Sequence, residues 1–161
     1  MRIHLEGAKV PSGPDPAGVR RFLRGVLRGE GLRNAGITVV FTDDAGIRAL
    51  NARFRDRDGA TDVLAFPFSE DADHQEDLEP GAGPYLGDVV VSLDRARAQA
   101  PRFHNTSEAE LARLLAHGCL HLLGYDHHRP ADGRRMKAAE RRALAHYLPG
   151  SLWESAGPTA A

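Results

Sequence analysis

Residues 117–128 read HGCLHLLGYDHH, and this stretch decides how the C-terminal half of the chain folds. It ends the segment TSEAELARLLAHGCLHLL, in which leucines recur at helical spacing. Ser107 at the predicted N-cap and Glu110 three residues later match a capping box, and Gly124 fits the C-terminal stop of a helix. The sequence therefore predicts a buried helix that carries histidines, followed by a turn that carries more of them.

The spacing of the histidines places two of them on one face of this helix. His117 and His121 are four residues apart, so their side chains stack one turn apart. His127 follows the glycine stop and can turn back as a third ligand, although His128 fits that role equally well on spacing alone. Cys119 lies roughly opposite the pair, where a packed small apolar side chain is expected.

Three imidazoles with an open fourth position describe a catalytic zinc site, with one Zn2+ per chain. A structural zinc site would use four ligands, mostly thiolates, and Cys119 is the single cysteine of the chain. The alternative is a set of surface or hydrogen-bonded core histidines. The pattern is similar to the metalloprotease motif H-E-x-x-H, but Gly118 stands in place of the catalytic glutamate. Asp126 is then a candidate for the base, or for a residue that orients a histidine.

The rest of the chain predicts a mixture of strands and helices, and so an α/β or α+β class. The expected strands are 2–6, 36–42, 61–68 and 86–93, with Pro67 marking an edge or a strand end. The expected helices outside 107–123 are 16–28, a helix capped by Thr42 or Asp43 that carries Ile47, Leu50 and Phe54 inward, 94–99, and 130–147. Residues 1–150 are expected to form one domain, and residues 151–161 a disordered tail.

Composition narrows the class of protein further. The chain has 161 residues, 42% of them hydrophobic, and a net charge of −1, which is typical of a globular domain. No stretch approaches the roughly 18 apolar residues of a membrane span, and the N-terminus lacks the apolar segment of a signal peptide. A single cysteine is compatible with a reducing compartment, so we expect a cytoplasmic protein without a membrane partner.

Two charged features are ambiguous in the sequence. Arg20, Arg24 and Arg28 line one face of the first helix, where they could hold RNA phosphates or simply face water. Residues 69–84 form an acidic loop without calcium-loop spacing, and a solvated insertion explains them best.

Four motifs in order resemble those of the YbeY family, bacterial endoribonucleases and rRNA maturation factors. HGCLHLLGYDH is similar to the family pattern H-G-x-L-H-L-x-G-Y-D-H. LNARFRDRDGATDVLAFPF resembles a segment that ends in T-D-V-L-S-F-P, with Ala65 where the family usually has serine. GDVVVS resembles a G-D-I-x-I-S strand, and Met136 and Glu140 match a methionine and a glutamate in the last helix.

The resemblance implies a fold, a site and a substrate. It implies a small mixed sheet of four strands flanked by helices, one of which binds metal, which is an α+β fold. It implies that His117, His121 and His127 bind zinc, and that Arg55 is a functional arginine near the path of the RNA. Its members act in the cytoplasm on ribosomal RNA of the small subunit, in 16S 3′-end maturation and ribosome quality control.

The expected chemistry is hydrolysis of a phosphodiester, in which zinc activates water and Arg55 stabilises charge on the phosphoryl oxygens. Two rival interpretations remain: a zinc hydrolase of another class, such as a peptidase, and a ribosome-assembly factor without catalysis. The first would need a base that Gly118 cannot supply, and the second would use the metal only to fasten the His127 turn to the helix.

Overall fold

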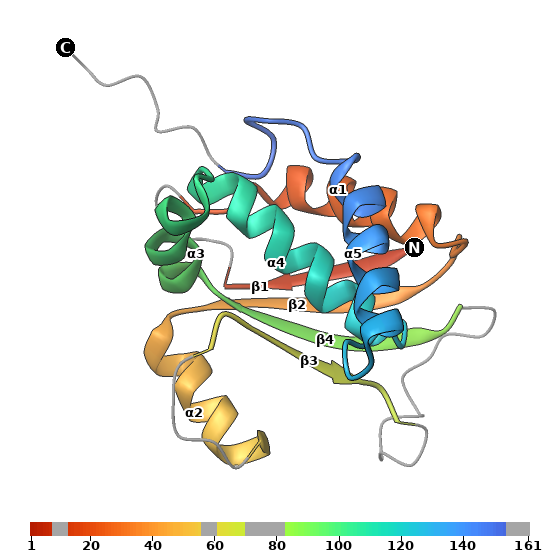
Figure 1. Cartoon of the computed structure of the whole chain (residues 1–161), viewed down its shortest axis with the longest axis horizontal. Helices are drawn as coiled ribbons and strands as arrows, with labels where there is room; N and C mark the ends of the chain where they lie inside the picture. Colours follow the sequence, from red (N-terminus) through yellow and green to blue (C-terminus); the bar gives the residue numbers. More distant parts are fainter. Residues whose placement is uncertain (8–12, 56–60, 70–82, 154–161) are drawn as a thin grey trace.

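A mixed sheet of four strands, with helices on both faces, organises the chain (Figure 1). The computed structural model describes residues 1–7, 13–55, 61–69 and 83–153. In chain order the elements are β1 (Arg2–Glu6), α1 (Pro16–Gly29), β2 (Gly36–Thr42), α2 (Asp44–Arg55), β3 (Val63–Pro67), β4 (Tyr85–Ser92), α3 (Leu93–Gln99), the 3-10 helix η2 (Ala100–Phe103), α4 (Ser107–Leu122) and α5 (Pro130–Leu144).

The strands lie in the order β1-β2-β4-β3. β1, β2 and β4 run parallel, and β3 pairs antiparallel with β4. The prediction of an α+β fold with a mixed sheet is confirmed. β3 is an edge strand that ends at Pro67, as expected for a residue that cannot donate a backbone hydrogen bond.

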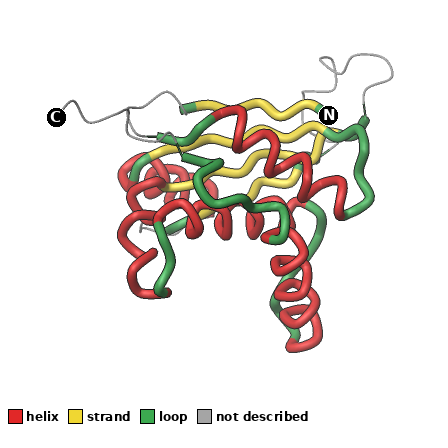
Figure 2. The backbone as a smooth tube through the Cα atoms, turned by 90° about the horizontal axis from the view of Figure 1, so that it is seen from above, coloured by secondary structure: helices red, strands yellow, loops and turns green. Residues whose placement is uncertain are grey.

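Alternate side chains of the strands point to opposite faces of the sheet, and each set packs in a separate hydrophobic core. Ile37, Val39, Val89 and Val91 point to one face, where they pack with apolar residues of α1, α3, α4 and α5. Val90 and Leu64 point to the other face, where they pack with Ile47 of α2. Most helices therefore lie on one side of the sheet, as Figure 2 shows, and α2 is positioned alone on the other side.

The start of α4 differs from the predicted capping box. Thr106, and not Ser107, is the N-cap, and its hydroxyl accepts a hydrogen bond from the backbone N–H of Ala109. Glu110 does not reach back to the cap. It is fully buried and accepts hydrogen bonds from Gln99 and from Arg113. The capping box was wrong because these partners, supplied by the folded chain, hold the glutamate more strongly than an exposed backbone N–H would.

Three other expectations need correction. Phe54 is not directed inward, because 56% of it is exposed. The last helix ends at Leu144 and not at residue 147. The predicted tail at 151–161 begins too early, because Leu152 is fully buried and Trp153 forms a β-bridge with Pro14; residues 154–161 lie outside the described part.

Cys119 is fully buried, as the sequence predicts. His4, His104 and His146 are exposed. Among the described helices, none is long and apolar enough to cross a membrane. Most of the acidic loop 69–84 lies outside the described residues.

Candidate metal centre

Two of the three predicted ligands come from the exposed margin of α4. His117 and His121 are half-buried, and their Nε2 atoms face each other at 3.0 Å. Their ring centroids lie 4.6 Å apart. The buried leucines on the inner face of α4 fix the rotation of the helix, so that the two imidazoles project together into the space beside β3.

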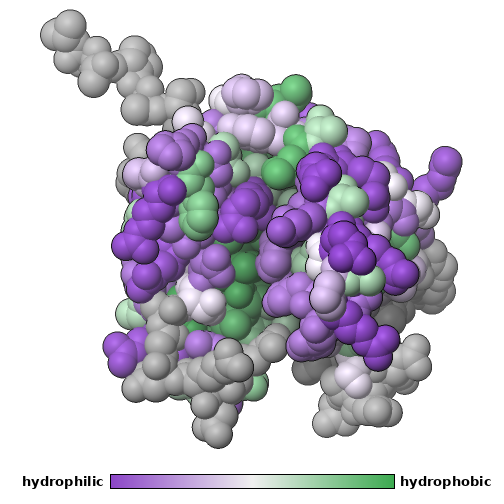
Figure 3. Space-filling view, viewed as in Figure 1, coloured by the Kyte–Doolittle hydropathy of each residue, from purple (hydrophilic) through white to green (hydrophobic). Residues whose placement is uncertain are grey.

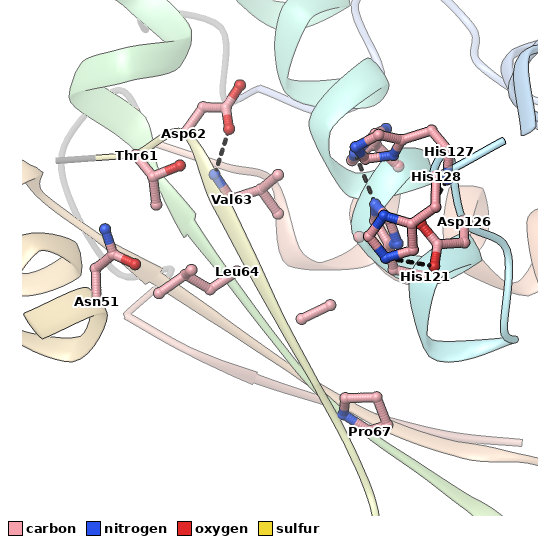
Figure 4. Close-up of a pocket in the computed structure, with 13 residues that line it drawn as sticks. Asn51, Thr61, Asp62, Val63, Leu64, Pro67, His121, Asp126, His127 and His128 are labelled. Atoms are coloured by element: carbon pink, nitrogen blue, oxygen red, sulfur yellow. Dashed lines mark hydrogen bonds and ion pairs between the residues drawn. The ribbon is translucent and has the colours of Figure 1, made fainter. Parts of the chain in front are cut away.

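The turn after α4 brings in the third histidine. Gly124 adopts a φ of 93°, a left-handed conformation that glycine takes without strain, and the chain reverses there. One nitrogen from each of His117, His121 and His127 lies within 4.8 Å of the others. His128 points elsewhere: its side chain is 83% exposed and lies 3.0 Å from Asp126 Oδ2. Of the two histidines that the spacing allows, His127 is therefore the one that lies with His117 and His121 (Figure 4).

Glu140 of α5 is hydrogen-bonded to His117 through the ring nitrogen that does not face His121. His117 Nδ1 lies 2.6 Å from Glu140 Oε1, so the ring N–H donates to this carboxylate. That bond leaves the Nε2 lone pair directed at the other histidines, which is the form of imidazole that binds a metal. The hydrogen bond to His117 lowers the pKa of Glu140 even though burial opposes it, so the carboxylate stays ionised.

His121 is also prepared to act as a neutral ligand. Burial lowers its pKa, and the nearby rings of His117 and His127 lower it further. Its hydrogen bond to the backbone of Tyr125 and the charge of Asp126 oppose this shift without reversing it. A metal ligand must be deprotonated, so this environment favours metal binding at neutral pH.

Tyr125 fastens the turn that carries His127. Its hydroxyl donates to Glu30 Oε2 at 2.7 Å and accepts from Arg142 Nη2 at 3.2 Å. Glu30 follows α1 and Arg142 belongs to α5, so three parts of the chain meet at this hydroxyl. Sequence reasoning missed this anchor because no local pattern links residues 30, 125 and 142.

A cleft of about 730 Å³ opens in front of the three histidines. Its opposite wall is the edge strand β3, with Val63, Leu64 and Ala65, and beyond it Asn51 of α2 (Figure 4). In the space-filling view a hydrophobic strip lies in a hollow between hydrophilic side chains (Figure 3). The cleft therefore has apolar side chains on the β3 wall opposite the imidazoles, and a concave surface of this kind is where a ligand would bind.

Gly118 explains why the peptidase glutamate is missing. A Cβ built on Gly118 would lie 2.6 Å from Val89 Cγ1 and 3.0 Å from Val63 Cγ2. Gly118 borders the cleft but packs against the sheet, so a larger side chain there would separate α4 from β3 and β4.

Of the two predicted catalytic residues, Asp126 and Arg55, the structure describes only the side chain of Asp126. Asp126 lines the cleft, but its Oδ1 accepts from the backbone N–H of His127 at 2.5 Å and its Oδ2 pairs with His128. Its observed contacts thus stabilise the turn. Arg55 is the last residue of α2, and its side chain lies outside the described part of the structure.

Thr61 and Asp62 also line the cleft. Asp62 Oδ1 accepts from the backbone N–H of Val63 at 2.8 Å and so caps the start of β3.

The donor set fits a divalent metal ion. Three imidazole nitrogens converge, the His117 ring has a carboxylate partner on its far side, and the His121 ring is hydrogen-bonded to backbone. Imidazole suits zinc, copper, iron and nickel, so the donors alone do not select one metal.

Comparison with known proteins identifies the family of this chain. The family model described as Endoribonuclease YbeY matches residues 15–148. A protein named Endoribonuclease YbeY from Anaeromyxobacter sp. (strain Fw109-5) is 49% identical over 132 residues, which are 81% of this chain and 65% of that protein. One of the same name from Thermus thermophilus is 39% identical over 127 residues, 79% of this chain and 87% of that protein.

A solved structure shows a similar fold. The solution structure of TM1509 from Thermotoga maritima matches with a TM-score of 0.56 and 25% sequence identity, over 92% of this chain and 98% of that one. The family model, the curated relatives and the cluster of three histidines at the predicted positions agree, and the chain belongs to the Endoribonuclease YbeY family.

Proposed function

We propose that this protein is a zinc-dependent endoribonuclease that acts in the cytoplasm on ribosomal RNA of the small subunit, in 16S 3′-end maturation and ribosome quality control. The observation that carries the proposal is the convergence of His117, His121 and His127 beside an open cleft of about 730 Å³. The relatives are named Endoribonuclease YbeY, and this name supports cleavage of RNA as the reaction. The choice of zinc rests on the three-imidazole donor set, and the choice of ribosomal RNA on the family resemblance.

When bound, the metal would supply Lewis-acid chemistry, which polarises a phosphoryl oxygen and makes water a better nucleophile. The protein's own part is positioning. Glu140 holds the His117 ring in one tautomer, and Tyr125 and Asp126 hold the turn of His127. Arg55 is proposed to bind the scissile phosphate and to stabilise its developing charge.

A peptidase is the rival that the structure disfavours most clearly. The position that carries the base in H-E-x-x-H helices is Gly118, which packs directly against Val63 and Val89. Incubation of the purified protein with RNA and with peptide substrates, side by side, separates the two activities. Cleavage of peptide without cleavage of RNA would overturn the proposal.

The decisive experiment pairs metal analysis with cleavage of a precursor RNA that contains the 16S 3′ end, with and without a chelator. We expect close to one zinc per chain and cleavage that the chelator abolishes. His117→Ala and His121→Ala should each lose most of the zinc, while the neighbouring His128→Ala should keep it, because His128 lies outside the cluster.

The result also tests a non-catalytic assembly role. If His121→Ala stays folded and bound to ribosomes, and the wild-type protein cleaves no RNA, the metal only fastens the turn. Full zinc content in both His117→Ala and His121→Ala would show instead that the site is wrong.

A further inference from the structure

We propose that the exposed basic faces of α1 and α5 form one surface that binds the phosphate backbone of RNA outside the cleft. This inference rests on the proposed function, because it extends the path of the same substrate beyond the metal centre. The surface is defined by Arg21, Arg24 and Arg28 on α1 and by Arg134, Lys137 and Arg141 on α5.

α1 and α5 carry a net positive charge, whereas the rest of the chain carries a net negative charge. α1 contains four arginines and no acidic residue. α5 contains five basic residues and two acidic ones, of which Glu140 faces His117. The chain as a whole has 21 basic and 22 acidic residues, so the remainder is net acidic. A general preference of the sequence for arginine does not produce such a separation, because it would spread positive charge over all elements.

The two helices lie together on the same side of the sheet (Figures 1 and 2). Arg142 of α5 pairs with Glu30, directly after α1, at 3.4 Å. A Cβ on Gly25 of α1 would lie 2.8 Å from the ring of His146, just beyond α5, so the helices also touch there. The two helices are therefore neighbours on this side of the sheet, and Figure 3 shows a mostly hydrophilic surface over α5.

The basic side chains of this surface are available to a partner. All six are exposed. The salt bridges of α1 and α5 within the described part of the chain join Arg135 to Asp132, Arg142 to Glu30 and Glu140 to His117, and they involve none of the six. Five of the six are arginines, whose planar guanidinium binds phosphate in a bidentate manner. RNA is the partner we propose, because it is the substrate of the nearby cleft in the proposed function; an acidic protein surface would be the alternative partner.

The surface is also close enough to the metal centre to act on the same RNA. Glu140 contacts His117 at 2.6 Å from the inner side of α5, and Lys137 and Arg141 flank Glu140 in the sequence. A phosphate on the outer face of α5 is therefore separated from the histidines by about one helix diameter, roughly 10 Å. RNA that leaves the cleft on this side would meet α5 first and α1 next.

The test replaces the charges without changing the helices. The triple variants Arg21→Gln/Arg24→Gln/Arg28→Gln and Arg134→Gln/Lys137→Gln/Arg141→Gln keep side chains of similar helix propensity. Arg102→Gln, at an exposed arginine of η2, is the control. Affinity is measured by fluorescence anisotropy over a range of salt, with a short single-stranded RNA that fills only the cleft and with a several-fold longer one.

We expect each triple variant to bind the longer RNA more weakly and to lower its log–log salt slope by up to about 2, since each contact with a single strand contributes about 0.7. Affinity for the short RNA, zinc content and the behaviour of Arg102→Gln should stay at wild-type values. Wild-type affinity and slope in both triple variants, or an equal loss for the short RNA, would overturn the inference. Because binding is measured separately from cleavage, a wild-type protein that binds RNA without cleaving it would count against the proposed function alone.

Discussion

At the scale of single residues, the metal centre depends on side chains that never touch the metal. Glu140 fixes the tautomer of His117, and Tyr125 fixes the turn of His127. Both come from outside α4, so each can be changed while the three imidazoles are kept.

We expect Glu140→Gln to lower the affinity for zinc by about 10–100-fold, the range typical of residues that orient a metal ligand. The amide still accepts a hydrogen bond from His117, but it no longer supplies the charge that strengthens the bond. Competition with a chromogenic chelator measures the change. Asp132→Asn on the same helix is the control, because its contact with Arg135 is a surface pair at 3.7 Å. Equal affinity in Glu140→Gln and wild type would show that the carboxylate has no role in binding.

We expect Tyr125→Phe to weaken zinc binding while the apoprotein loses at most about 1 kcal/mol of stability. The variant keeps the ring packed against Leu120 and Met136 but loses the hydroxyl between Glu30 and Arg142. Zinc titration and thermal unfolding of the apoprotein separate the two effects. Tyr147→Phe, a tyrosine away from this turn, should leave zinc affinity unchanged.

The histidines could be predicted from the sequence, but their supports could not. The ligands lie within eleven residues, and helical spacing followed by a glycine brings them together by local geometry alone. Glu140 is 23 residues from His117 and Glu30 is 95 residues from Tyr125, so their contacts depend on how helices pack. The sequence marks Glu140 only as a position that matches the family and gives it no role.

At the scale of elements, the close contact between α4 and the sheet places the histidines beside β3. Gly118 makes this contact possible, since any Cβ there would collide with Val89. In the sequence, Gly118 already disfavours a peptidase because it replaces the catalytic glutamate of the motif. The structure adds that the close packing of α4 on the sheet requires glycine at this position.

Gly118→Ala should destabilise the protein by about 1–3 kcal/mol, the usual cost of an overpacked core, although alanine is the better helix former. Urea unfolding measures the loss. Gly133→Ala on α5 is the matched control: the nearest atom to its Cβ would be His127 Cβ at 4.0 Å, so we expect a neutral or stabilising effect. A stabilised Gly118→Ala variant would mean that α4 can move off the sheet freely.

Element types followed from periodicity and turn residues, whereas errors arose at their ends. The four strands and the helices were predicted within a few residues, because each buries a face with a clear repeat. The cap of α4 was placed one residue too late, since Thr106 and Ser107 are equivalent by residue type. Phe54 has the spacing of a core residue, but α2 covers only part of its face of the sheet and leaves that ring exposed.

At the scale of the whole molecule, a buried ionic network joins α4 to α3 and to the loop before α4. Glu110 is fully buried and contacts Arg113, Gln99 and Asn105. Burial alone would raise the pKa of Glu110, but the hydrogen bonds from Arg113 and Gln99 outweigh it and lower the pKa below the ordinary value of 4.5. The folded protein therefore holds this carboxylate in its charged form more strongly than the unfolded chain does.

This shift gives the sign of the response to acid. The stabilisation from Glu110 is complete above pH 4.5 and is lost as the pH falls through the lower pKa of the folded state. We expect the urea midpoint of the wild type to decline more steeply than that of Glu110→Gln between about pH 5 and pH 3. Identical slopes for the two proteins would show that the carboxylate does not favour the folded state.

The contacts between the segment before α1 and the segment after α5 have a practical consequence. Trp153 bridges to Pro14, the backbone N–H of Asp15 donates to Leu152, and Leu152 is buried in the main core. A protein truncated after Gly150 would lose the contacts that hold the segment after α5 against the segment before α1. Affinity tags and fluorescent fusions should therefore be attached downstream of Trp153.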